Sequence, residues 1–195
     1  MSVRELQDYT FVAKYARWIP EKKRRETWNE AVSRVKQMML DKYADDPKVH
    51  EDIEWAYEMM RKKRVLGSQR ALQFGGKPIF KHNARIYNCI TSFCDRLRFF
   101  QECMYLLLCG CGTGFSVQKH HIEKLPQLVR SKNGTKKYII PDTIEGWSDA
   151  VGILVSSYFK QDELFPEYVG KNVNFDYSEI RPAGAFLNSS GGKAP

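Results

Sequence analysis

The sequence predicts an α/β fold in which a helical region precedes a parallel sheet or barrel. Apolar residues recur at helical spacing between residues 27 and 64. Farther along, a short β-like run at 85–91 is followed by an apolar helical segment at 96–109. A glycine-punctuated run at 111–117 then leads into a second β-like segment. A strand, a helix and a second strand form the unit of a parallel sheet or barrel.

The chain is expected to open with an arm and a first helix. Residues 1–24 alternate polar and aromatic side chains, so we expect this arm to lie across another element, with Pro20 interrupting any helix. Residues 27–43 carry an apolar stripe of helical period, which is typical of core packing. Thr27 and Glu30 have the spacing of a capping box at the start of this helix.

A second helix is expected to begin at Pro47, since proline suits the first turn of a helix. It should end in the basic run at 61–64. Cations near a helix C-terminus interact favourably with the helix dipole, so this run is explained without nucleic acid. Residues 68–76 form a short segment that ends in a glycine turn, and a loop follows at 77–83.

The helix between the two β-like runs is expected to start after Asp95, which is a suitable N-cap residue. We expect its apolar side chains to be buried, with Cys103 an inert core thiol. These side chains are Phe99, Phe100, Cys103, Met104, Leu106, Leu107 and Leu108. Nearer the C-terminus, Asp142 or Thr143 should cap another helix, and residues 172–176 should form a strand.

Composition limits the class of protein. The chain has 195 residues, 43% of them hydrophobic, which is enough for one core and not for two. The net charge of +8 favours anionic partners such as nucleotides, nucleic acid or acidic proteins, although solvated helix faces explain the same charges. There is neither an apolar leader segment nor a long apolar run, so we expect a cytoplasmic protein with reduced thiols and no membrane partner.

All five cysteines fall between Cys89 and Cys111. An odd, clustered set is a poor disulfide framework. The spacing does not give a pair of CxxC knuckles, and the four histidines do not supply the second half of a zinc site, so no metal is expected.

Cys89 and the glycine run are the candidates for chemistry. A cysteine in the middle of a strand points either into the core or toward an active centre. The run from Gly110 to Gly114 lets backbone approach a ligand closely, although an ordinary helix C-terminus explains it equally well. It is neither a GxGxxG motif nor a P-loop. A thiol beside bare backbone N–H groups suits redox chemistry on a phosphorylated substrate.

Several short motifs stand in the order seen in ribonucleotide reductases. They are YARWIPE at 15–21, RETW at 25–28, RAL at 70–72, NC at 88–89, GTGFSV at 112–117, PDTIEGW at 141–147 and IRPAGA at 180–185. The chain most resembles the adenosylcobalamin-dependent (class II) ribonucleoside-triphosphate reductases, and the resemblance spans residues 9–195. It implies a helical N-terminal region at 1–66, followed at 67–195 by the first half of a ten-stranded α/β barrel.

The resemblance also implies an activity and a cofactor. The family removes the ribose 2′-hydroxyl of a ribonucleotide by radical chemistry, with adenosylcobalamin as the cofactor and a deoxynucleotide as the allosteric effector. A thiyl radical on one cysteine abstracts a hydrogen atom, and two other cysteines deliver reducing equivalents. A thioredoxin-like protein or a dithiol then reduces the disulfide that forms. We expect most cobalamin contacts to lie outside this chain.

Individual roles carry over only where this sequence matches the family motif. Cys89 matches the first cysteine of the redox-active pair. The resemblance places four substrate-binding residues and one effector-binding residue in this chain; they are Ser68, Asn88, Cys111 and Gly112 for the substrate, and Asp95 for the effector. Two departures concern the effector site: residues 118–121 read QKHH in place of a basic loop, and the short segment at 128–137 suggests that a partner subunit supplies part of that surface.

The family's thiyl cysteine and second redox cysteine are expected beyond the small-residue loop at 189–195. The chain alone is therefore predicted to be inactive, with a separate C-terminal piece completing the barrel. One alternative is a non-catalytic nucleotide-binding remnant of the same fold. Another is a basic RNA- or DNA-binding module, which the lack of an aromatic and basic platform motif disfavours.

Overall fold

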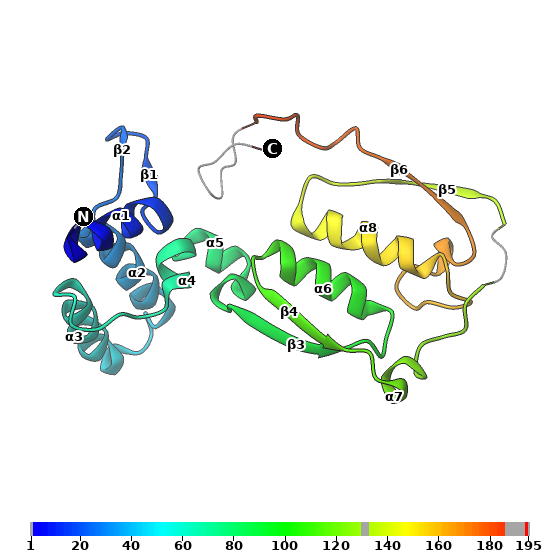
Figure 1. Cartoon of the computed structure of the whole chain (residues 1–195), viewed down its shortest axis with the longest axis horizontal. Coiled ribbons are helices and arrows are strands. Elements are labelled where there is room, and N and C mark those ends of the chain that lie inside the picture. The colour runs from blue at the N-terminus through cyan, green and yellow to red at the C-terminus, as the bar shows by residue number, and fades with distance from the viewer. Residues whose placement is uncertain (1, 130–132, 186–193, 195) are drawn as a thin grey trace. The chain divides into compact units, whose positions relative to one another are not determined.

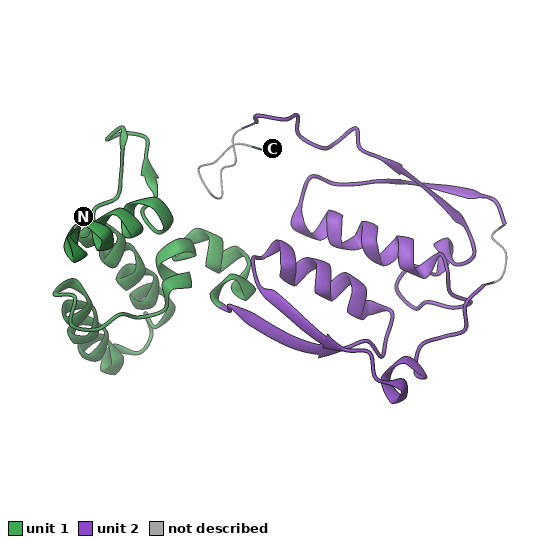
Figure 2. Cartoon of the chain, viewed as in Figure 1, with its two compact units in different colours: residues 1–86, 186–195 green, residues 87–185 purple. Residues whose placement is uncertain are grey.

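The structure, a computed structural model, describes residues 2–129, 133–185 and 194. The chain divides into two compact units (Figure 2). The first comprises residues 1–86 together with 186–195, and the second comprises residues 87–185. Within the described residues, none of the helices is both long and apolar enough to cross a membrane.

The first unit is mostly helical (Figure 1). Its helices are α1 (Val3–Lys14), α2 (Trp28–Lys42), α3 (His50–Arg61), α4 (Gln69–Phe74) and α5 (Lys77–Lys81), with 3-10 turns η1 (Pro47–Val49) and η2 (Asn83–Ile86). Two short strands, β1 (Trp18–Ile19) and β2 (Arg24–Arg25), pair antiparallel. The N-terminal arm therefore contains a helix that the sequence analysis did not identify, and none of the residues of that helix is buried.

The capping box predicted at the start of α2 is confirmed. The Thr27 hydroxyl accepts a hydrogen bond from the Glu30 backbone N–H, and the Glu30 carboxylate accepts one from the Thr27 backbone N–H. The apolar stripe of α2 forms the core of this unit with residues from α3, α4 and α5. Its buried members are Ala31, Val32, Val35, Met38, Met60, Ala71, Leu72 and Ile79. The second helix ends at Arg61, the first residue of the basic run in which its end was predicted.

The second unit contains two strand–helix–strand segments (Figure 1). The first is β3 (Cys89–Phe93), α6 (Arg98–Leu108) and β4 (Gly112–Ser116), and the second is β5 (Thr135–Ile139), α8 (Ile144–Ser156) and β6 (Asn172–Asp176). Both strand pairs are parallel, as predicted for β3 and β4. Helix α7 (Lys119–Ile122) and the 3-10 turn η3 (Pro166–Tyr168) lie in the connections.

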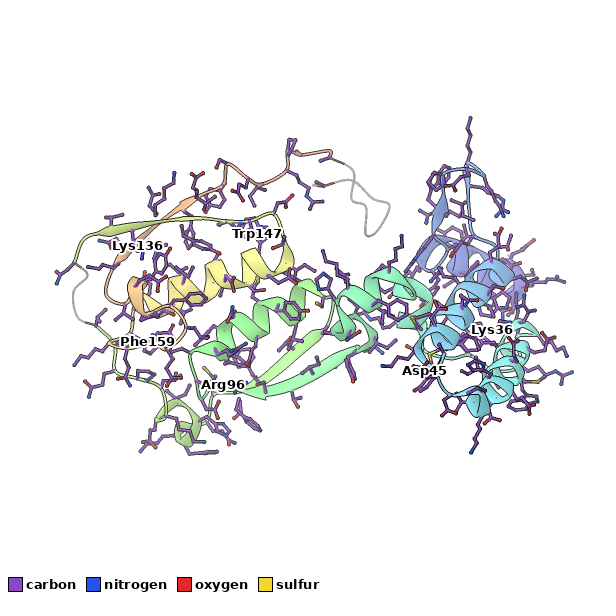
Figure 3. All side chains as sticks on the ribbon, turned by 180° about the vertical axis from the view of Figure 1, so that it is seen from behind. Lys36, Asp45, Arg96, Lys136, Trp147 and Phe159 are labelled. Atoms are coloured by element: carbon purple, nitrogen blue, oxygen red, sulfur yellow. The ribbon has the colours of Figure 1, made fainter. Side chains whose placement is uncertain are left out.

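Helices α6 and α8 pack side by side between the two strand pairs (Figure 1). Thr143, one of the two residues predicted to cap α8, does so by accepting a hydrogen bond from Gly146 N–H. Figure 3 shows Trp147 on α8 and Lys136 on β5. The Trp147 ring lies 6.2 Å from the ring of Tyr177, which follows β6, so this contact joins the helix to the chain after that strand.

Two expectations about α6 are wrong. Its N-cap is Leu97, without a side-chain hydrogen bond, because the Asp95 carboxylate pairs with Arg96 instead. Of its apolar residues only Phe99 is buried, whereas Leu107 is 50% exposed and Cys103 is half-buried. Among the described residues the helix packs mainly against α8 and one strand pair, so part of its apolar surface has no neighbour.

An ion pair links the two strands of the β5–β6 pair. The Lys137 ammonium lies 2.5 Å from the Asp176 carboxylate, which also accepts a hydrogen bond from the Ser178 backbone N–H. These hydrogen bonds lower the pKa of Asp176 from 3.8 to about 2. A carboxyl group whose pKa is lower in the folded state stabilises the fold above its unfolded-state pKa, and that contribution disappears as pH falls through the folded-state value.

We therefore expect the contribution of Asp176 to stability to be lost between pH 3.8 and about 2. Carboxyl-detected NMR titration of the folded chain should place the Asp176 midpoint near the lower value. Asp176→Asn should remove this part of the acid transition while leaving the neutral-pH fold intact. A folded-state midpoint at the ordinary value of 3.8 would contradict the prediction.

Candidate active site

The candidate site is built on the pairing of β3 with β4. Cys89 lies opposite Gly112, and Thr91 lies opposite Gly114. The Gly112 backbone N–H donates a hydrogen bond of 2.7 Å to the Asn88 carbonyl oxygen, which fixes this register at the start of both strands. Paired residues on neighbouring strands point to the same face of a sheet, so the Cys89 thiol shares its face with two residues that have no side chain.

Cys89 is accessible, unlike the other thiols. Of the five cysteines, all within the described residues, only Cys89 is exposed. Cys94, Cys109 and Cys111 are buried, and burial raises the pKa of the Cys94 thiol. A reactive cysteine needs access to its partners, so Cys89 is the thiol in this chain best placed for redox exchange.

Cys111 has a different environment from Cys89. Its thiol is buried and donates a hydrogen bond of 3.4 Å to the Tyr87 carbonyl oxygen. Any substrate contact from this residue is therefore made through its backbone. The substrate role of Cys111 stays a prediction, and it concerns the backbone of this residue and not its thiol.

Ser68 belongs to the first unit, where it caps α4. Its hydroxyl accepts a hydrogen bond from the Ala71 backbone N–H at 3.3 Å. The cap explains a serine here on structural grounds, and the side chain is exposed. Asn88 and Gly112 lie together in the second unit with Cys89, so three of the predicted catalytic and substrate-binding residues lie at the start of one strand pair.

Asp95 follows β3 and takes part in a charged cluster. Its carboxylate lies 2.8 Å from Arg96 and 3.7 Å from Lys124. The hydrogen bond from Arg96, assisted by the charge of Lys124, holds the pKa of Asp95 below its ordinary value. Figure 3 shows Arg96 between β3 and α6. An effector role for Asp95 stays a prediction.

A histidine pair lies close to this cluster, in α7. His121 Nδ1 is 3.0 Å from Ser116 Oγ, and its ring contacts Phe93 with 4.6 Å between ring centroids. Burial, with the charges of His120 and Lys124, lowers the pKa of His121. The segment that departs from the family's basic loop thus packs against the C-terminal ends of β3 and β4.

Sequence reasoning missed a hollow on the opposite face of β3 from Cys89. It has a volume of about 470 Å³ and is lined in part by Ser92, Arg98, Gln101, Glu145 and Asp149. Burial, with the charge of Glu145, raises the pKa of Asp149, and a hydrogen bond from Gln101 opposes that shift. The four-residue spacing of the two acids on α8 was the available signal, since it places them on one helix face.

The hollow beside β3 is of the size that holds a drug-sized ligand, and so is the hollow of about 600 Å³ in the first unit. No three His, Cys, Asp or Glu side chains in the described part of the chain are grouped so that they would hold a metal ion.

Comparison with solved structures shows which fold the chain shares. The chain superimposes on the crystal structure of a B12-dependent (class II) ribonucleotide reductase with a TM-score of 0.80 and 25% identity. The match covers 95% of this chain and 34% of that one. The structure thus has the fold of part of a ribonucleotide reductase, and the predicted α/β class is confirmed.

Curated relatives carry the name of one branch of these reductases. The chain is 27% identical to the adenosylcobalamin-dependent ribonucleoside-triphosphate reductase of Lactobacillus helveticus, over 97% of this chain and 34% of that protein. It is also 27% identical to the enzyme of the same name from Lactobacillus leichmannii, over 95% of this chain and 33% of that protein. No family model matches the chain. These relatives confirm the resemblance seen in the motifs, and the chain spans about a third of their length.

Proposed function

We propose that the chain is the N-terminal part of an adenosylcobalamin-dependent ribonucleotide reductase and acts only together with a C-terminal piece. The observation that carries this is the match of 95% of the chain to about one third of a class II reductase. The two strand–helix–strand segments support a half-barrel at 67–195, because each joins two parallel strands through a helix. The helical region is assigned to residues 1–66.

The proposed reaction replaces the 2′-hydroxyl of a ribonucleotide, taken here as a triphosphate, with hydrogen. Two thiols supply two electrons and two hydrogens: one hydrogen goes to C2′, the other leaves in water with the hydroxyl, and the two sulfurs form a disulfide. Cys89 is one of the two thiols, and the other belongs to the C-terminal piece. A thioredoxin-like protein or a dithiol restores both thiols by exchange.

Substrate binding is assigned around the start of the β3–β4 pair. Asn88 and Gly112 lie beside Cys89, and the backbone of Cys111 directly precedes Gly112. Glycine at this point lets a ligand approach the main chain closely. Ser68 is proposed as a further substrate contact from the first unit, and Asp95 as a contact to a deoxynucleotide effector.

Adenosylcobalamin supplies radical chemistry when it is bound. Its contacts are assigned mostly to the C-terminal piece, as the resemblance to the reductase family implies. This chain's own contribution is a reducing thiol and part of the substrate surface.

Reconstitution tests the proposal. The chain is co-expressed with a polypeptide from the neighbouring reading frame that carries the remaining two thirds of the reductase. Deoxyribonucleotide formation with adenosylcobalamin and a dithiol is then measured for the mixture and for each piece alone. We expect activity in the mixture only. Absence of turnover in a mixture whose pieces associate would count against the proposal.

A further inference from the structure

Two glycines of β4, one at its start and one in its middle, have no local structural reason to be glycine. A methyl group added at Gly112 would lie 3.5 Å from Cys89 Sγ, and one added at Gly114 would lie 3.9 Å from Thr91 Cγ2. Both are ordinary van der Waals distances, and neither glycine has a positive φ. Glycine inside a strand weakens the strand, so the folded chain should be at least as stable with alanine at either position.

Other glycines of the same unit show the contrast. An added Cβ at Gly146 would lie 2.3 Å from the Pro141 carbonyl oxygen, and one at Gly152 would lie 2.8 Å from the Phe165 ring. Packing within the chain therefore requires glycine at these two helix positions. A glycine in a strand that packing does not require marks a place where something else approaches the backbone.

The exposed face of the β3–β4 pair shows what surrounds that space. Cys89, Thr91, Gly112 and Gly114 are all exposed and share one face. The other face is turned to α6, as the contact of Phe115 with Phe99 shows, with 4.9 Å between ring centroids. The Thr91 hydroxyl has no hydrogen-bond partner among the described residues.

Residues two apart on one face of a strand are separated by about 6.6 Å, a span that a sugar ring with its hydroxyl groups bridges. A thiol and a hydroxyl at that spacing on β3, beside two glycines on β4, suit a ring that carries polar groups on its edge. A packed protein segment would instead favour apolar side chains on the strand beneath it.

We propose that Gly114 and Thr91 are specificity-determining residues of the proposed reaction. The missing side chain at Gly114 leaves room for the sugar ring of the nucleotide beside Cys89, and the Thr91 hydroxyl forms a hydrogen bond with that ring. This inference rests on the proposed function and extends its substrate surface along the strand, past Gly112.

The test uses the reconstituted two-piece enzyme with cytidine triphosphate as the substrate. Gly114→Ala and Gly114→Val should raise KM in a graded way, with at least a tenfold rise for valine. The thermal midpoint of the chain and its affinity for the C-terminal piece should stay unchanged or increase. Thr91→Val should lower kcat/KM about tenfold, while Thr91→Ser, which keeps the hydroxyl, restores it. Thr113→Val, on the face toward α6 between the two glycines, is the matched control and should leave KM unchanged.

Three results would overturn the inference. Unchanged kinetics in Gly114→Val would show that the space is not used by substrate. A lower midpoint of the chain would show that the glycine has a structural role. Weaker association with the C-terminal piece would show that a protein segment occupies the face.

Alkylation of Cys89, followed by mass spectrometry, separates this inference from the proposed function. If the wild-type mixture forms no deoxynucleotide, the proposed function fails, and protection of Cys89 by cytidine triphosphate still reports binding at this face. Protection in wild type that is lost in Gly114→Val supports the inference. Absence of protection in wild type, or equal protection in both, overturns it.

Discussion

Cys89→Ser is expected to lower deoxyribonucleotide formation by the reconstituted enzyme by about a thousandfold or more. Serine keeps the size of the side chain, but it cannot form a disulfide or be restored by thiol exchange. The thiol is exposed at the start of β3, where Gly112 leaves its flank open. Radiolabelled product formation over many turnovers is the measurement, with the association of the two pieces checked in parallel.

Cys103→Ala is the matched control for this loss. Cys103 is half-buried on α6, and burial raises the pKa of its thiol, which leaves it less thiolate for exchange. Its removal should leave turnover close to the wild-type rate. When the reductant is withheld after one turnover, mass spectrometry should find Cys89 in a disulfide with a cysteine of the C-terminal piece. Repeated turnover by Cys89→Ser would refute the redox role.

Glu26→Ala should lower the free energy of unfolding of the first unit by about 3 kcal/mol. Glu26 is 8% exposed and binds Arg34 through two hydrogen bonds, of 2.7 and 2.8 Å. Arg34 in turn donates to the Leu72 and Gly75 carbonyl oxygens at the end of α4, and the Arg17 backbone N–H donates to Glu26 at 3.1 Å. Loss of the carboxylate leaves a partly buried guanidinium without its counter-charge.

Hydrogen exchange of the amides in α2 and α4 measures this effect within the first unit. Glu54→Ala is the matched control, because its pair with Lys36 is also 2.7 Å long but Glu54 is 54% exposed. An exposed pair contributes less than about 1 kcal/mol. Equal losses in the two variants would show that burial of Glu26 adds nothing, contrary to the prediction.

Local sequence signals predicted an element correctly where its capping or turn residues agreed with its hydrophobic periodicity. The capping box at Thr27 and the cap at Thr143 form as expected, since a hydroxyl near the first free backbone N–H groups satisfies them whatever surrounds the helix. The β3–α6–β4 unit followed from a β-like run, an apolar helix and a glycine-punctuated strand. Helix α1 was missed although Ser2 and Glu5 form its capping box, because the aromatic residues and Pro20 favoured an extended arm.

The sequence by itself determined the α/β class, the family resemblance and the choice of Cys89 as the candidate redox cysteine. Only the tertiary structure decided that Cys89 is exposed while Cys111 is buried, and that Asp95 pairs with Arg96 and does not cap α6. It also decided that Leu107 stays half exposed and that Asp149 meets Gln101 in the hollow beside β3. The physical reason is that periodicity and caps depend on residues that are neighbours in the sequence. Burial and ion pairing depend on which distant segments pack against those residues.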